Sequence, residues 1–215
     1  MENPDKLIWV YDVISPFAYL SLPRIARLGE DVPIEARPVL FAALLDHFGQ
    51  LGPAEIVPKR RFTYRFALWR ARQLGIPMRF PPAHPFNPLA ALRLIIAAGS
   101  DLRAAGVVLQ AVFRDGRDVS DPAVIADLAR ELAVPDPQAA LADPSVKARL
   151  RANTEWASSR GIFGVPTLVI GEEMFWGQDG LDMALDYLAH PEAFADPQMR
   201  AADTLPTGVS RKKAS

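Results

Sequence analysis

Strand-like segments occur only near the two ends of this 215-residue chain. Near the start, residues 7–14 and 33–40 have the character of buried strands, and the apolar spacing of residues 16–28 predicts a helix between them. Near the other end, the stretch GVPTLVIGEEMFWG predicts two strands joined by a turn at 171–173, with a helix following at 181–189. One sheet must therefore be assembled from two distant parts of the chain.

The long segment between these parts has helical patterns. Its five expected helices cover residues 58–75, 88–99, 102–116, 121–133 and 143–161. We therefore predict an α/β protein in which a helical insertion interrupts the sheet domain and lies over the sheet as a lid. The sheet domain is expected at 1–41 and 161–190, the insertion at 42–160, and a loosely held tail at 191–215.

The composition argues against several classes of protein. A formal net charge of −1 and an isoelectric point near 6.3 remove the long-range attraction that binders of nucleic acid or anionic membranes usually carry. The start of the chain lacks a secretion signal, and the longest apolar stretch, residues 88–99, is short for a membrane span and contains Arg93. We expect no nucleic-acid or membrane partner and a cytoplasmic location.

The chain contains no cysteine. This excludes a disulfide framework, a thiolate zinc site and a redox dithiol on the protein itself. His47, His84 and His190 are not spaced as metal ligands, so we predict no metal site, and the sequence has no phosphate-binding glycine motif. Any thiol chemistry must therefore arrive with a bound thiol.

Charge is segregated along the chain. Between Glu55 and Asp101 there are eight basic residues and no acidic one, whereas between Arg160 and Arg200 there are seven acidic residues and no basic one. The two segments either face one another across a cleft or are solvated independently. The basic segment also contains aromatic residues at helical spacing, which favours a core stripe over nucleic-acid binding: these are Phe62, Phe66 and Trp69.

The pair Ser15-Pro16 stands between the first strand and the first helix. It has a structural explanation, because Ser is a favoured N-cap residue and Pro is favoured at the first helical position. The same pairing recurs at Asn87-Pro88, Asp121-Pro122, Asp136-Pro137 and Asp143-Pro144. It also has a functional explanation, because the hydroxyl and the free N–H groups of the helix could together stabilise an anion such as a thiolate.

Two further motifs leave alternatives open. Pro166 either simply opens a strand or follows a cis bond that leaves the backbone groups of Val165 free to pair with an extended peptide. In WGQDG, Asp179 either caps the last helix or joins Gln178 in holding the charged end of a ligand.

Several stretches together resemble the 2-hydroxychromene-2-carboxylate isomerase family, which is similar to kappa-class glutathione transferases and more distantly to DsbA-type oxidoreductases. The stretches are YDVISPFAYL, RPVLFAALLDHFG, PKRRFTYR, LGIPMRFPPAHPFNPLAALR, GRDVSDPAV and GIFGVPTLVIGEEMFWGQD. The resemblance implies a thioredoxin-like fold interrupted by a large all-helical insertion domain. It also implies glutathione as the bound thiol and a homodimer.

The resemblance assigns roles to individual residues. Ser15 stands where DsbA relatives carry the first redox cysteine, and it would stabilise the glutathione thiolate. Val165, before a cis Pro166, would pair with the cysteinyl backbone of glutathione. Gln178 and Asp179 would hold its γ-glutamyl end.

Two further contacts are implied at the other end of glutathione. Lys59 would approach the glycine carboxylate, and Gln50 stands where kappa enzymes place an asparagine. Gly180 replaces an arginine that is frequent in the family, so no charge contact is expected from that position.

The implied reaction interconverts 2-hydroxychromene-2-carboxylate and trans-o-hydroxybenzylidenepyruvate, a step of aromatic catabolism with a small aromatic carboxylate as substrate. Two alternatives remain at this point. One is a kappa-like glutathione transferase that acts on other electrophiles. The other is a non-catalytic thioredoxin-fold protein that binds a peptide beside Pro166.

Overall fold

The computed structural model describes residues 6–209. It contains one four-stranded sheet in the order β2-β1-β3-β4. The strands are β1 (Leu7–Tyr11), β2 (Ile34–Pro38), β3 (Thr167–Ile170) and β4 (Glu173–Trp176). β2 runs parallel to β1, β3 pairs antiparallel to β1, and β4 pairs antiparallel to β3. The two distant parts of the chain therefore form one sheet, as predicted.

Helix α1 (Pro16–Asp31) joins the two parallel strands. Such a connection is expected because parallel neighbours need a crossover, and a helix is the usual one. Its inner face is apolar and includes Ala18, Leu20 and Ile25, all of which are buried.

All helices between β2 and β3 belong to one continuous segment of the chain. They are α2 (Phe41–Phe48), α3 (Val57–Leu74), α4 (Leu89–Ala97), α5 (Leu102–Phe113), α6 (Pro122–Glu131), α7 (Pro137–Ala142) and α8 (Pro144–Ser159). Five correspond to the expected helices, whereas α2 and α7 were not predicted because they are too short to show a sustained period. The side chains of Asp121, Asp136 and Asp143 accept the N-cap hydrogen bonds that the Asp-Pro pairs predicted.

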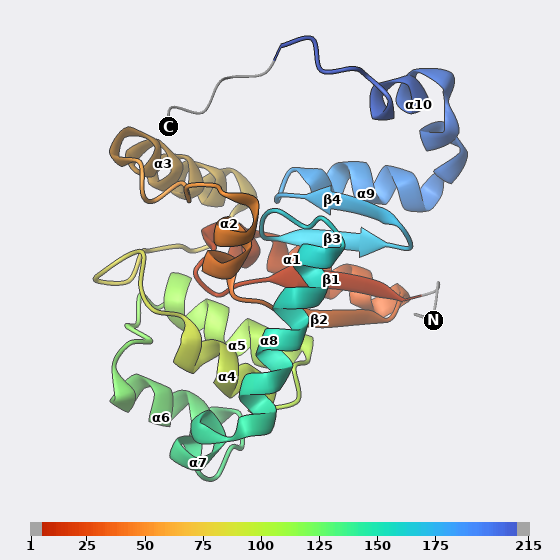
Figure 1. Cartoon of the computed structure of the whole chain (residues 1–215). Helices are drawn as coiled ribbons and strands as arrows, with labels where there is room; N and C mark the ends of the chain where they lie inside the picture. Colours follow the sequence, from red (N-terminus) through yellow and green to blue (C-terminus); the bar gives the residue numbers. More distant parts are fainter. Residues whose placement is uncertain (1–5, 210–215) are drawn as a thin grey trace.

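The sheet is covered on both faces. On one face, Leu7, Trp9 and Tyr11 of β1 join a large core with α1, α4, α5 and α6. On the other face, Ile8 and Val10 pack in a smaller core with residues of α2 and α8. Figure 1 shows α8 crossing in front of the strands, with α4–α7 on one side of the sheet. β1 is therefore buried on both faces, which explains its unbroken apolar sequence.

The C-terminal part differs from the loose tail that we expected. After α9 (Gly180–Ala189) the chain forms a 3-10 helix, η1 (Pro191–Ala195), and α10 (Pro197–Asp203). Phe194 lies against Phe175 and Tyr187, with ring centroids 6.0 and 4.9 Å away. An aromatic anchor therefore fixes η1 on the sheet domain. The last six residues of the expected tail lie outside the described part of the chain.

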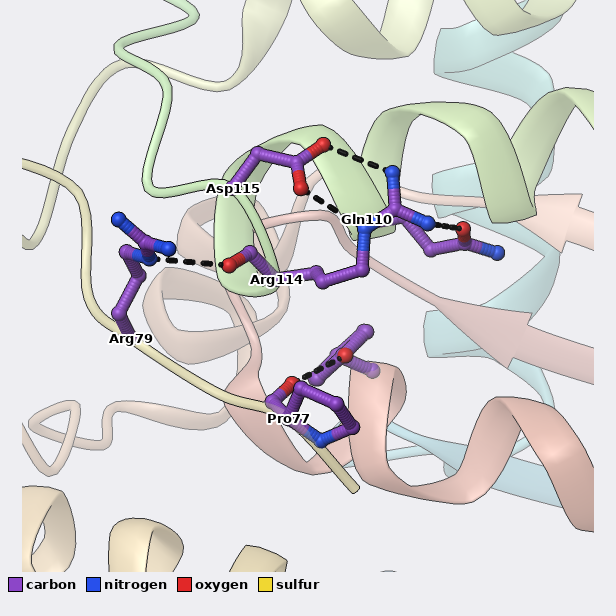
Figure 2. A network of polar contacts seen from close by, with 6 residues as sticks. Pro77, Arg79, Gln110, Arg114 and Asp115 are labelled. Carbon is purple, nitrogen blue, oxygen red and sulfur yellow. Dashed lines mark hydrogen bonds and ion pairs between the residues drawn. The ribbon is translucent and has the colours of Figure 1, made fainter.

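The segment between α3 and α4 has no regular structure but is firmly held (Figure 2). The Tyr19 hydroxyl donates to the carbonyl oxygen of Pro77 at 2.6 Å. The backbone N–H and the Nε of Arg79 donate to the carbonyl oxygens of Phe113 and Arg114 at 2.7 and 3.1 Å. This irregular segment is thus bound to both α1 and the end of α5.

Among the described residues, no salt bridge joins the acidic segment between Arg160 and Arg200 to the basic segment between Glu55 and Asp101. In the acidic segment, Asp182 pairs with Arg24 at 2.6 Å, and Glu172 pairs with Arg160 at 2.9 Å. Within residues 6–209, no helix is long and apolar enough to cross a membrane.

Candidate functional site

The register of the sheet places Ser15 beside Val165. Val10 of β1 pairs with Thr167 of antiparallel β3, so the end of β1 lies next to the start of β3. The Ser15 hydroxyl donates to the Val165 carbonyl oxygen at 3.4 Å and accepts from the Ala18 N–H at 3.3 Å. Both contacts are near the upper limit for a hydrogen bond, so neither holds the hydroxyl strongly.

The Val165–Pro166 peptide bond is cis. The Pro166 carbonyl oxygen accepts from the Gly177 N–H at 2.9 Å, so the end of β4 lies alongside. The next residue, Gln178, is only 4% exposed. Its Oε1 accepts from Arg70 Nε of α3 at 2.9 Å, whereas its buried Nε2 has no partner. Gln178 therefore belongs to the same end of the sheet as Ser15, and α3 reaches over it.

The remaining predicted residues are more peripheral. Asp179 is exposed at the start of α9, and its side chain makes no capping bond. Lys59 is exposed in the first turn of α3, eleven residues before Arg70, and so about 16 Å from it along the helix axis. Gln50 is exposed after α2. Within the described chain, the structure brings together four predicted residues: Ser15, Val165, Pro166 and Gln178.

The aromatic residues of α3 are exposed, so the predicted core stripe is wrong. Phe62, Phe66 and Trp69 are 68%, 39% and 51% exposed. The reason is that α3 packs inward through the small side chains of Ala67 and Ala71, which are buried.

These aromatic rings form a continuous row that reaches the site. Phe66 is stacked on both Phe62 and Trp69, with centroids 5.9 and 5.7 Å away. Phe66 also approaches Phe17, two residues after Ser15, at 6.0 Å. The row therefore leads from the surface of α3 to the start of α1.

Asp12 is a buried acid below Ser15 that sequence reasoning missed. It is fully buried, and its two carboxylate oxygens accept from the N–H groups of Ile14 at 3.0 Å and Phe41 at 2.8 Å. Its carbonyl oxygen accepts from the Ser15 N–H at 3.1 Å. Burial raises the pKa of Asp12 to about 7, although the hydrogen bonds oppose the rise. The sequence signal that could have identified Asp12 is its position as a carboxylate inside an apolar run that was expected to be a buried strand.

His84 is a second missed residue. Its Nε2 lies 2.7 Å from the Ile14 carbonyl oxygen, and its Nδ1 lies 2.7 Å from the Tyr64 hydroxyl of α3. Burial lowers the pKa of His84, and the contact with Ile14 partly opposes this. The sequence considered His84 only as a metal ligand. Among the described residues, no three His, Cys, Asp or Glu side chains form a group that could hold a metal ion.

Comparison with known proteins agrees with this architecture. Residues 6–189 match the family model of the DSBA-like thioredoxin domain. A 2-hydroxychromene-2-carboxylate isomerase of Pseudomonas putida is 31% identical over 183 residues, covering 80% of this chain and 89% of that protein. A Caenorhabditis elegans protein named glutathione S-transferase kappa 2 is 28% identical over 214 residues, which cover 89% of this chain and 95% of that protein.

A solved structure of a 2-hydroxychromene-2-carboxylate isomerase superposes with a TM-score of 0.73 at 25% identity. The superposition covers 89% of this chain and 99% of that chain. The thioredoxin-like fold expected from the sequence is therefore confirmed. The chain belongs to the DsbA-like thioredoxin family, together with the 2-hydroxychromene-2-carboxylate isomerases and the kappa-class glutathione transferases.

Proposed function

We propose that this protein is a glutathione-dependent enzyme that interconverts 2-hydroxychromene-2-carboxylate and trans-o-hydroxybenzylidenepyruvate. One observation carries the proposal. At the end of β1, where thiol oxidoreductases of this superfamily have a cysteine, a weakly held Ser15 hydroxyl faces the Val165 backbone in a chain without cysteine. The relatives named as isomerases and kappa transferases support the same chemistry.

The residues at this end of the sheet fit glutathione. Gln178 Nε2 is a buried donor without a partner, which suits the γ-glutamyl carboxylate. Asp179, exposed beside it, suits the ammonium group of the same end. The Val165 backbone is the expected partner of the cysteinyl backbone. Lys59 lies about 16 Å from Arg70 along α3, so its long side chain would extend toward the glycine carboxylate of an extended tripeptide about 10 Å long.

Ser15 has a defined task in this proposal. When bound, glutathione supplies the thiolate that adds to a conjugated carbon, permits bond rotation and leaves again. The Ser15 hydroxyl turns from Val165 and donates to the sulfur, at the N-terminus of the sixteen-residue helix α1. A free thiol has a pKa of about 8.5, and lowering it by two units needs about 2.7 kcal/mol. A charge-assisted hydrogen bond supplies about 1.5–3 kcal/mol, so this one hydroxyl and the helix suffice.

The surface next to Ser15 suits a flat aromatic carboxylate. The aromatic row at Phe17, Phe66 and Phe62 offers ring faces for stacking. Arg61 and Arg65 are exposed on the same helix and can attract the carboxylate. We also infer that α3 acts as part of the lid of the helical insertion, residues 42–160, that Gln50 borders the glycine end of the site, and that the protein is a cytoplasmic homodimer.

The test combines binding and turnover. Calorimetry with glutathione and the isomerisation of 2-hydroxychromene-2-carboxylate with and without glutathione should show binding and strict dependence on the cofactor. Epoxide, peroxide and halo-aromatic substrates serve as the comparison. Turnover of those compounds without isomerisation would instead support a kappa-like transferase, which the C. elegans relative favours. Failure to bind glutathione would reject both enzymes and leave a peptide-binding protein.

A further inference from the structure

The contacts of His84 form a small polar cluster within an aromatic enclosure. Its ring lies near Phe80, Phe86 and Phe113, with centroids 5.5–6.0 Å away. Both ring nitrogens nevertheless have partners, Ile14 O and the Tyr64 hydroxyl, each at 2.7 Å. A partly buried imidazole with two short contacts is positioned more strictly than packing alone requires.

Donor counting assigns the tautomer. The Ile14 carbonyl oxygen can only accept, so His84 Nε2 carries a proton. The Tyr64 hydroxyl lies within reach of two groups, because it is 2.7 Å from His84 Nδ1 and 2.8 Å from the His84 carbonyl oxygen. In the neutral ring, the hydroxyl donates to Nδ1. In the protonated ring, Nδ1 donates to the hydroxyl oxygen, and the hydroxyl donates to the carbonyl.

The cluster can therefore bind a proton without moving a heavy atom. A turn of the Tyr64 hydroxyl hydrogen keeps both ring nitrogens hydrogen-bonded in either state, and the His84 carbonyl oxygen accepts from the hydroxyl only when the ring is protonated. The partner of Nε2, the Ile14 carbonyl, belongs to the peptide whose nitrogen is that of Ser15. The ring that binds the proton is thus hydrogen-bonded, through its other nitrogen, to the peptide that precedes the Ser15 side chain.

We propose that His84 is a positioning residue that fixes the Ile14–Ser15 peptide and takes up a proton when glutathione binds beside Ser15 as a thiolate. This inference rests on the proposed function. The S–H bond breaks with its electron pair left on sulfur, an Nδ1–H bond forms, and solvent relays the proton. Because coupling between two sites is reciprocal, the imidazolium stabilises the thiolate as much as the thiolate stabilises the imidazolium.

Other charged groups around His84 set the background for this coupling. Tyr64 comes from α3, together with Arg60, whose positive charge acts on Tyr64. Asp12 comes from the β1–α1 connection and binds the Ile14 N–H. In the free protein, burial keeps the ring neutral near pH 7.5, as the lowered pKa of His84 indicates. At pH 7.5 Asp12, with a pKa of about 7, is already largely ionised, so a thiolate next to Ser15 adds a further negative charge near the ring.

The test follows the imidazole nitrogens of His84 by nitrogen-15 NMR at pH 7.5. Glutathione should convert the ring from neutral to doubly protonated, whereas S-methylglutathione, which cannot ionise, should leave it neutral. His84→Gln keeps a donor for Ile14 but no titrating ring, so the thiol pKa of bound glutathione should rise by about one pH unit. His47→Gln, at an exposed position on α2, should change nothing.

The outcomes separate this inference from the proposed function. If wild type lowers the thiol pKa while the His84 ring stays neutral and His84→Gln gives the same thiol pKa, the inference is wrong and the proposed function stands. If wild type does not bind glutathione, both are wrong. The NMR measurement on wild type decides the matter even if His84→Gln does not fold.

Discussion

The buried carboxyl of Asp12 makes the stability of this protein depend on pH in a defined direction. Burial raises the pKa of Asp12 from 3.8 to about 7. The folded protein therefore holds a proton that the unfolded chain has already released, and the free energy of unfolding falls as pH rises toward 7. The full effect is about 4 kcal/mol, of which about 2.7 kcal/mol falls between pH 5 and pH 8.

The assay is urea unfolding of wild type and Asp12→Asn at pH 5 and pH 8. Wild type should lose about 2.7 kcal/mol more between these pH values than the variant. Asp12→Asn should also be less stable at pH 5, because its amide group faces the N–H of Ile14 or Phe41 in place of an acceptor. Carboxyls with lowered pKa values, such as Glu35, oppose the trend but are present in both proteins. Equal pH dependence in the two proteins would refute the reasoning.

Two other substitutions probe the walls of the site. In Gly164→Ala, the new Cβ would overlap Trp176 Nε1, so the half-exposed indole should move outward. We expect a red shift of tryptophan emission and a loss of about 1 kcal/mol in urea unfolding, and an unchanged spectrum would contradict this. Arg70→Ala removes the hydrogen bond to Gln178 and should weaken glutathione binding about fivefold by calorimetry, with Arg72→Ala, exposed on the same helix, as the control. Equal affinities would show that the Gln178 contact is not needed.

The local elements of the fold could be predicted because their signals are local. The apolar run at 7–14 identified β1, and each Asp-Pro pair identified a helix start through a side chain that caps its own turn. The expected strand at 7–14 was too long, since β1 ends at Tyr11 and the chain turns at Asp12. Apolar character persists through this turn because Val13 is also buried, so hydropathy alone could not place the boundary.

The parts of the site that involve distant residues could not be predicted from pattern. The contact between Arg70 and Gln178 spans 108 positions, and the contact between Ile14 and His84 spans 70. Periodicity also misplaced the aromatic face of α3, because it shows that residues share a face and not which face is buried. Local motifs singled out Ser15, Val165 and Gln178 and left their roles open, and the resemblance to a family assigned those roles, whereas Asp12 and His84 became visible only through their buried contacts.

The central claim is that Ser15 stabilises a thiolate and is not only a helix cap. The most direct measurement is the ultraviolet thiolate absorbance of bound glutathione across pH, in wild type, Ser15→Ala and Asp121→Ala. Ser15→Ala removes the N-cap of α1, and Asp121→Ala removes the N-cap of the distant helix α6. Each variant should lower the free energy of unfolding by about 1 kcal/mol. We predict that only Ser15→Ala raises the thiol pKa, by one to two pH units, about the value of one charge-assisted hydrogen bond. Bound glutathione with the same thiol pKa in wild type and Ser15→Ala would contradict the account.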